Sequence, residues 1–238
     1  MGTFALLGAA CGGARAPAAP TPLRVFAAAS LAQPFAALAE AAPDDARPRL
    51  SFAGSAQLAL QLQQGAQACV FASADAVTMH KVVAAGLAVG EPAVFARNRL
   101  AIAVPAGNPK GVRGLADLAR RDLVVLLGAP DVPAGRYARQ ALQRAGVAVI
   151  ASSDEPSVRA IVGKVQAGEA DAGIVYRTDC AVAGVTGVPL DPAHDVVAEC
   201  LVVALTSAAD PARALAFVER LRGDVGRRIL ARHGFELP

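Results

Sequence analysis

Four apolar segments of this sequence end where a helix is expected to begin. Ser30 follows RVFAAA, and Ser55 follows LSFAG. Farther along, VVLLG leads through a loop to Ala134, and Pro156 suits the first position of a helix with Val158 in its first turn. The first N–H groups of a helix lack partners within it and carry partial positive charge. Together these four positions would offer an anion site without lysine or arginine.

Each serine also has a purely structural explanation. Ser30 can cap a helix over 31–41, and Ser55 can cap a helix over 56–64. A serine cap stabilises a helix by about 1 kcal/mol, which is sufficient reason for either residue. Pro34 falls where the first of these helices needs a backbone donor, so its first turn is expected to be irregular. Only convergence of the four positions would make a binding site.

Catalytic and metal sites are not indicated. Ser55 follows Gly54 in a strand-to-helix turn, as in serine hydrolases, but Ala53 and Gln57 occupy the two glycine positions of G-x-S-x-G. The sequence has no C-x-x-C, and no metal-ligand spacing links its three histidines, His80, His194 and His233. We therefore expect neither an enzyme nor a cofactor nor direct cation ligands.

Short apolar strands alternate with helical segments along most of the chain. Strands are predicted at 23–28, 49–53, 69–72, 99–104, 123–127, 173–176 and near 196–205. Helices are predicted at 31–41, 56–64, 76–85, 136–145 and 157–167, and two more at 211–233 divide near Gly223. This alternation predicts an α/β fold with mostly parallel sheets, in which ligands bind beyond the carboxyl ends of the strands.

Turn-rich segments at 104–114 and 185–195 suggest boundaries between two lobes. On this interpretation residues 1–22 form a tail, residues 23–103 and 202–238 form lobe I, and residues 104–201 form lobe II. The chain has 238 residues, which is enough for two small lobes with separate cores.

The composition excludes several classes of protein. Hydrophobic residues make up 54% and charged residues 18%, the reverse of a disordered chain. No apolar run approaches the roughly 20 residues of a membrane-spanning helix. Lys+Arg 23 against Asp+Glu 20 gives a formal net charge of +3, and no basic stripe indicates nucleic-acid binding.

The N-terminal tail and the cysteines indicate in which cellular compartment the protein resides. The first residues, MGTFALLGAACGGARAPAAP, resemble the end of a bacterial lipoprotein signal, with Cys11 as the lipidated residue, although they lack a positive charge and Gly8 stands where leucine is usual. A cytoplasmic tail with an incidental cysteine is the alternative. Cys180 and Cys200 could form a disulfide in an oxidising compartment, and Cys69 is expected in the core.

Five motifs carry a more specific resemblance. In order along the chain they are VFAAASL, FAGSAQLALQLQQGA, VFASAD, DVPAGRYARQAL and GIVYRTD. They resemble the molybdate-binding proteins of bacterial ABC importers, and the similarity extends from residue 23 to the closing GRRILARHGF. Five matches in order are far more specific than one short motif.

The resemblance implies a type II periplasmic-binding-protein fold, with two lobes that close on one oxyanion around a hinge. It implies that Ser30 and Ser55 in lobe I donate from hydroxyl and backbone N–H groups. In lobe II it implies backbone donors at Ala134 and Val158 and a phenolic donor at Tyr176. Cys69 stands where the family usually has aspartate, which should alter local hydrogen bonding without abolishing binding.

Such a site offers donors only, so a proton on the ligand would lack a partner. The expected ligand is molybdate, and tungstate of nearly the same size; a binding protein for sulfate or another oxyanion is the alternative. A sensory module of the same architecture is less favoured, because no DNA-binding segment precedes the lobes. The implied partners are an ABC permease and its ATPase, for a monomer that is periplasmic or anchored at the cell surface.

Overall fold

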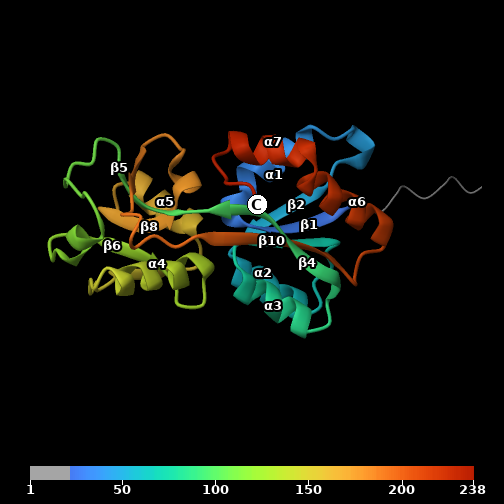
Figure 1. Cartoon of the computed structure of the whole chain (residues 1–238), viewed down its shortest axis with the longest axis horizontal. Helices are drawn as coiled ribbons and strands as arrows, with labels where there is room; N and C mark the ends of the chain where they lie inside the picture. The colour runs from blue at the N-terminus through green and yellow to red at the C-terminus, as the bar shows by residue number, and fades with distance from the viewer. Residues whose placement is uncertain (1–21) are drawn as a thin grey trace, which may run out of the picture.

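The molecule has two lobes that lie side by side, each built on a five-stranded sheet with helices on both faces (Figure 1). This computed structural model describes residues 22–238, so Cys11 and its tail lie outside the described residues. The α/β class predicted from the alternation of strands and helices is confirmed. Among residues 22–238, no helix has both the length and the apolar character needed to cross a bilayer.

The sheet of lobe I has the order β2-β1-β3-β10-β4. Strand β1 pairs in parallel with β2 and β3, whereas β10 is antiparallel to β3 and β4. Its strands are β1 Arg24–Ala28, β2 Arg49–Ala53, β3 Val70–Ser73, β4 Ala88–Asn98 and β10 Ala198–Leu205.

The sheet of lobe II has the order β7-β6-β8-β5-β9. Strand β6 is parallel to β7 and β8, and β5 is antiparallel to β8 and β9. Its strands are β5 Leu100–Pro105, β6 Val125–Gly128, β7 Ser153–Glu155, β8 Ala172–Tyr176 and β9 Val185–Pro189. Both sheets are mixed, so the prediction of mostly parallel sheets was wrong. Parallel neighbours need a crossover connection, and β5 and β10 come directly from the other lobe without one.

Helices cover both faces of each sheet. In lobe I, α1 and α7 lie on one face and α2 and α3 on the other; in lobe II, α5 and α4 lie on opposite faces (Figure 1). The α-helices are α1 Ala32–Glu40, α2 Ser55–Gln63, α3 Ala76–Ala84, α4 Pro133–Arg144, α5 Val158–Gln166, α6 Pro211–Arg222 and α7 Asp224–Arg232. Short 3-10 helices occur at Ala29–Leu31, Asp44–Ala46, Leu115–Ala119 and Arg177–Cys180. The predicted division near Gly223 is confirmed, because Gly223 separates α6 from α7.

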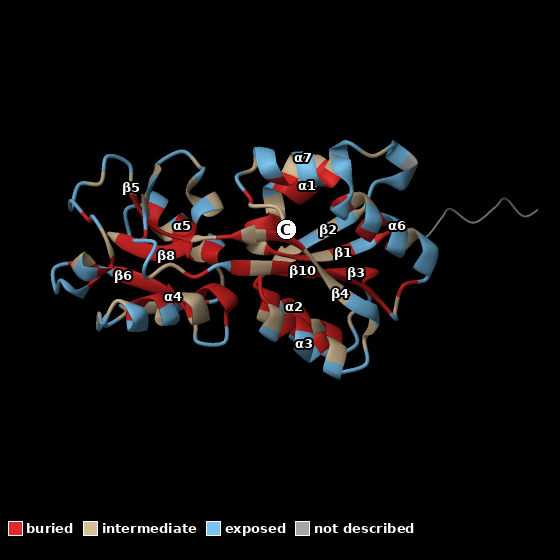
Figure 2. Ribbon diagram, viewed as in Figure 1, coloured by how far each residue is buried: buried red, intermediate tan, exposed pale blue. Residues whose placement is uncertain are grey.

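Buried residues are concentrated along the two sheets and on the inner faces of the helices (Figure 2). In lobe I, the ring of Phe35 on α1 lies 5.9 Å from that of Phe95 and 6.1 Å from that of Phe217, measured between centroids. On the other face, Leu58 of α2 and Met79 of α3 belong to a separate cluster with sheet residues. The helices on the two faces of the lobe I sheet therefore pack into different apolar clusters.

The chain crosses between the lobes twice, at positions that differ from the predicted boundaries. It enters lobe II between β4 and β5, at residues 98–100, and returns between β9 and β10, at residues 190–197. The predicted boundary at 104–114 is wrong, because β5 already belongs to the sheet of lobe II. Lobe I thus comprises residues 22–98 and 198–238, with lobe II between them. An apolar strand does not reveal from its sequence which sheet it joins.

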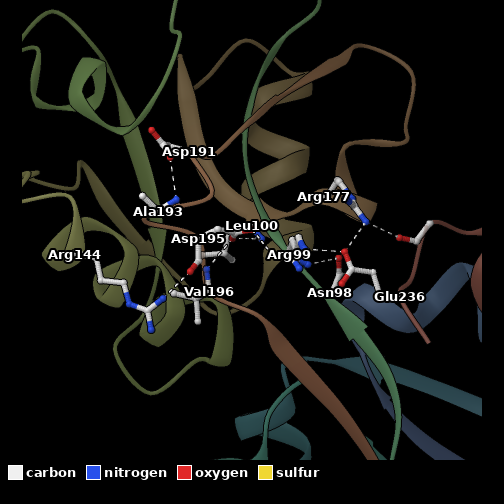
Figure 3. A network of polar contacts seen from close by, with 11 residues as sticks. Asn98, Arg99, Leu100, Arg144, Arg177, Asp191, Ala193, Asp195, Val196 and Glu236 are labelled. Atoms are coloured by element: carbon white, nitrogen blue, oxygen red, sulfur yellow. Dashed lines mark hydrogen bonds and ion pairs between the residues drawn. The ribbon is translucent and has the colours of Figure 1, made fainter. Parts of the chain in front are cut away.

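Ion pairs hold the two crossings together (Figure 3). Arg99 Nε donates to Glu236 Oε1 at 2.7 Å, and its Nη1 donates to Asp195 Oδ2 at 3.2 Å. Arg177 of lobe II also donates to Glu236, at 3.4 Å. Arg99 thereby joins the two crossings, which are the natural hinge between the lobes, and Glu236 fixes the C-terminal segment to the first crossing and to lobe II.

The junction of β6 with α4 is unusually tight. A Cβ built on Gly135 would lie 2.2 Å from the Ala129 carbonyl oxygen and 2.3 Å from that of Gly128. Real Cβ atoms do not approach backbone oxygens so closely, so only glycine fits at this position. This contact holds the first turn of α4 against the end of the sheet and so determines where Ala134 lies.

We expect Gly135→Ala to destabilise the protein by about 1–3 kcal/mol, because the clash is with backbone that cannot move aside. Gly163→Ala is the matched control, since Gly163 lies within α5 and a Cβ there meets nothing within 4 Å. The control should raise stability by roughly 0.5–1 kcal/mol. Urea unfolding measures both, and equal effects would show that the tight junction is unimportant.

Candidate functional site

A small cavity lies between the lobes, at the carboxyl ends of strands from both sheets. The cavity has a volume of about 20 Å³. It is lined by Ala28, Ala29, Ser30, Gly54, Ser55, Ala74, Val132, Pro133, Ala134, Ser157, Val158 and Tyr176. All five positions expected to bind the ligand are among them, so the structure brings together what the sequence could only suggest.

In lobe I the two serines do not act as the predicted helix caps. Helix α1 begins after the 3-10 turn that contains Ser30, with Leu31 as its cap, so the expected irregular first turn is confirmed. Helix α2 begins at Ser55 itself, with Gly54 as its cap. Neither helix start has a side-chain cap hydrogen bond. Capping therefore does not account for either serine.

Ser55 is held in place by the neighbouring strand. Its Oγ accepts a hydrogen bond from the backbone N–H of Ala74 at 3.1 Å, and the residue is only 2% exposed. Because the oxygen is used as an acceptor, the hydroxyl proton is left to donate. Ala74, which follows β3, was not singled out from the sequence, although it stands within the VFASAD motif.

In lobe II two helix N-termini reach the cavity. Pro133 and Ala134 open α4, and Val158 opens α5 after Ser157. The side chain of Ser157 caps α5 by accepting from the N–H of Ala160 at 3.3 Å. Pro133 has no N–H group, so Ala134 carries the first backbone donor of α4. The first turns of α4 and α5, whose backbone N–H groups lack intrahelical partners, therefore lie at the cavity wall.

Tyr176 ends strand β8 and is 2% exposed. Its phenolic oxygen is buried and has no hydrogen-bond partner among the described residues. Burial, with smaller effects from neighbouring groups such as Cys200 and Tyr137, raises the pKa of Tyr176 well above its usual value. The hydroxyl therefore stays protonated, and a buried donor without a partner is costly. An acceptor in the cavity would satisfy it.

No charged side chain lines this cavity among the described residues. Two carboxyl groups lie just behind it. Asp179 accepts from the backbone N–H of Tyr176 at 3.1 Å, and burial raises the pKa of Asp179 to about 7. Asp75 caps α3 and forms an ion pair with Arg136 of lobe II. Sequence reasoning missed the contact of Asp179 with Tyr176 and the ion pair between Asp75 and Arg136, since each depends on contacts that only folding creates.

A larger groove of about 400 Å³ lies beside the cavity and shares Ala29 and Ser30 with it. Its walls come from α1, α5 and the C-terminal segment, and they include Gln33, Arg159 and His233. The groove is open to solvent and reaches the edge of the cavity, so one flank of the cleft is less tightly closed than the rest.

The predicted disulfide is not formed. Cys180 and Cys200 are free thiols, and so is the buried Cys69. Cys200 lies in β10 of lobe I, whereas Cys180 ends a 3-10 helix of lobe II. Burial raises the pKa of each of these two thiols to about 12. Proximity in the predicted loop was misleading because the two residues belong to different lobes.

The described residues form no arrangement typical of a catalytic triad or a metal site. Ser55 Oγ is engaged by a backbone N–H, and no histidine hydrogen-bonds to Ser30 or Ser55 in the part of the chain that the structure describes. Within the same residues, no group of three His, Cys, Asp or Glu side chains could hold a metal ion.

Comparisons with known proteins agree with this geometry. Residues 23–236 match the family described as bacterial extracellular solute-binding protein. The chain is 41% identical to the molybdate-binding protein ModA of Mycobacterium tuberculosis, over 96% of this chain and 92% of the relative.

Two solved structures share the fold. The periplasmic molybdate-binding protein of Azotobacter vinelandii superimposes with a TM-score of 0.76 at 23% identity, covering 91% of this chain and 99% of that one. The sulfate-binding protein SubI of Mycobacterium tuberculosis superimposes with a TM-score of 0.80 at 19% identity, covering 91% of this chain and 87% of that one. The chain belongs to the bacterial extracellular solute-binding protein family.

Proposed function

We propose that this protein binds molybdate outside the cytoplasm and delivers it to an ABC permease. The observation that carries the proposal is the Tyr176 hydroxyl, a buried donor without a hydrogen-bond partner among residues 22–238, in a cavity that none of their charged side chains lines. The identity to a molybdate-binding relative over nearly the full chain supports the choice of ligand.

Donors alone discriminate against protonated anions. Phosphate retains a proton on part of its population near neutral pH. In this cavity that proton would meet N–H and O–H groups and lose its hydrogen bond, at a cost of about 1–3 kcal/mol. Molybdate, tungstate and sulfate carry no proton under these conditions. The protein is therefore expected to accept tetrahedral dianions and to reject phosphate.

Size distinguishes among the dianions. A sulfate ion is smaller than molybdate, so donors positioned for molybdate would leave its hydrogen bonds long and weak. Tungstate has nearly the size of molybdate and should bind as well. Sulfate binding is the second candidate, because the fold is shared with a sulfate-binding protein.

Transport requires that the bound and free forms differ in shape. Ligand contacts on both lobes stabilise a closed arrangement, which a permease and its ATPase can recognise. We further propose that the protein acts as a monomer and has no catalytic function. Lipid anchoring at Cys11 stays a prediction, since that residue lies outside the described part of the chain.

Molybdate should raise the melting temperature, and phosphate should not. A ligand at about 100 times its dissociation constant adds about 2.7 kcal/mol of stability, which is several degrees for a protein of this size. A dye-based melt is suitable because the chain has no tryptophan. Tungstate should match molybdate. Equal shifts with sulfate would contradict the molybdate assignment and leave a general oxyanion-binding protein.

Removing a single donor should weaken binding without unfolding the protein. Ser55→Ala and Tyr176→Phe should each raise the dissociation constant for molybdate about tenfold or more, the cost of one buried hydrogen bond to a charged group. Calorimetry measures the affinity. Tyr176→Phe should leave the stability of the ligand-free protein unchanged or higher, since it removes a donor that has no partner among the described residues.

Tyr137→Phe is the matched control, because Tyr137 lies on α4 and does not line the cavity. If the Tyr137 and Tyr176 variants bind equally well, the phenolic donor has been assigned wrongly.

Closure itself can be blocked at Gly54. A Cβ there would lie 2.4 Å from the carbonyl oxygen of Pro156, and its three nearest neighbours all come from lobe II. Gly54→Ala should therefore reduce affinity for molybdate at least tenfold, while the ligand-free protein melts within a few degrees of the wild type. Calorimetry and a melt of the same sample test this. Wild-type affinity would show that ligand binding does not need this close approach of the lobes.

A further inference from the structure

An ion pair outside the two crossing segments joins the lobes. Arg136 on α4 of lobe II donates through Nη2 to Asp75 Oδ2, and the same nitrogen donates to Thr78 Oγ1 of lobe I at 3.0 Å. The other terminal nitrogen of Arg136 donates to the carbonyl oxygen of Asp131 within lobe II. One guanidinium group is thus shared between the lobes.

The lobe I side of this contact is rigid and buried. The side chain of Asp75 is 2% exposed, and that of Arg136 is 23% exposed. Asp75 Oδ1 accepts from the backbone N–H of Thr78 at 3.0 Å, and Ser73 Oγ donates to the Asp75 carbonyl oxygen at 2.9 Å. The second carboxylate oxygen is directed to lobe II. A carboxylate buried to this degree needs a cation, and within residues 22–238 Arg136 is the cation that pairs with it.

The pair also touches the walls of the binding cavity. Asp75 directly follows Ala74, whose backbone N–H holds the Ser55 hydroxyl. Arg136 lies two residues after Ala134, in the first turn of α4. A displacement of either partner would therefore shift donors of the cavity. In addition, Asp75 carries a negative charge close to the place where a dianion would bind, and Arg136 offsets that charge.

The ion pairs at the hinge have a different position. Arg99, in the first crossing, and Arg177 of lobe II both pair with Glu236 (Figure 3). Arg136 lies on α4 and Asp75 is the N-cap of α3, so neither partner belongs to a crossing segment. When the lobes separate about the hinge, this pair must break.

We propose that Arg136 is a positioning residue that holds the lobes closed over the bound anion and slows its release. The proposal rests on the function proposed above, because it takes the cavity to be an oxyanion site. Arg136 does not line the cavity itself. It acts through Asp75 and through the first turn of α4.

The test is the rate of molybdate release. Protein loaded with radioactive molybdate is chased with unlabelled molybdate, and the bound fraction is followed by rapid filtration. Arg136→Gln should release the anion about tenfold faster or more, because breaking one side of a desolvated charge pair acts mainly on dissociation. Asp75→Asn retains an acceptor for the α3 cap but loses the charge, so its effect should be smaller. In the double variant the two effects should not add.

Arg120→Gln is the matched control. Arg120 lies in lobe II and pairs with Asp122 of the same lobe at 2.8 Å, and it does not line the cavity. This variant should release molybdate at the wild-type rate. Equal rates for Arg136→Gln and wild type, or an equal acceleration by Arg120→Gln, would overturn the proposal.

A ligand-free readout separates this result from the function itself. Small-angle scattering of the ligand-free protein should show a larger radius of gyration for Arg136→Gln than for wild type, since the closed form loses its interlobe pair. An unchanged radius together with an unchanged release rate would reject the role of Arg136. Wild-type protein that does not bind molybdate would instead reject the proposed ligand, and the scattering comparison would still decide whether the pair holds the lobes together.

Discussion

The cavity between the lobes is governed by one constraint: hydrogen-bond donors that are buried need an acceptor. Tyr176 places a protonated hydroxyl in a cavity where no described protein atom accepts from it. The Oγ of Ser55 accepts from the backbone N–H of Ala74, so its hydroxyl proton is free to donate to a ligand. Helices α4 and α5 add backbone N–H groups that have no partner within the helix. A small anion without protons would accept from all of these donors at once.

The fold brings these donors together from distant parts of the chain. Parallel strands within each sheet end at the same edge, where α2, α4 and α5 begin. The two crossings between the lobes then set the two edges against each other, and Arg99 joins the crossings by donating to Asp195. At Gly54 the lobes approach so closely that a side chain has no room. Position 54 therefore has to be glycine for the lobes to approach this closely.

Charge is placed around the cavity and not in it. Asp179 lies directly behind Tyr176, and burial raises its pKa to about 7, which reduces its negative charge near neutral pH. Asp75 is offset by Arg136 from the opposite lobe. A fixed positive charge inside the cavity would attract any anion, protonated or not. Neutral donors with distant compensating charges favour a fully deprotonated anion of one shape.

Much of this protein follows from the sequence alone. The helix starts near Ser30, Ser55, Ala134 and Val158 were predicted within a few residues, and so was the division at Gly223, because capping, proline and glycine signals are local. Strands β4, β7 and β9 were not predicted, and β5 was placed in the wrong lobe. The roles of the two serines as caps and the disulfide between Cys180 and Cys200 were also wrong. The missed strands, the misplaced strand, the caps and the disulfide all depend on how strands pair and on which residues face each other across the cleft. Local periodicity determines what kind of element a segment forms, whereas only packing of the two lobes decides that Tyr176 loses its water and that Asp75 meets Arg136.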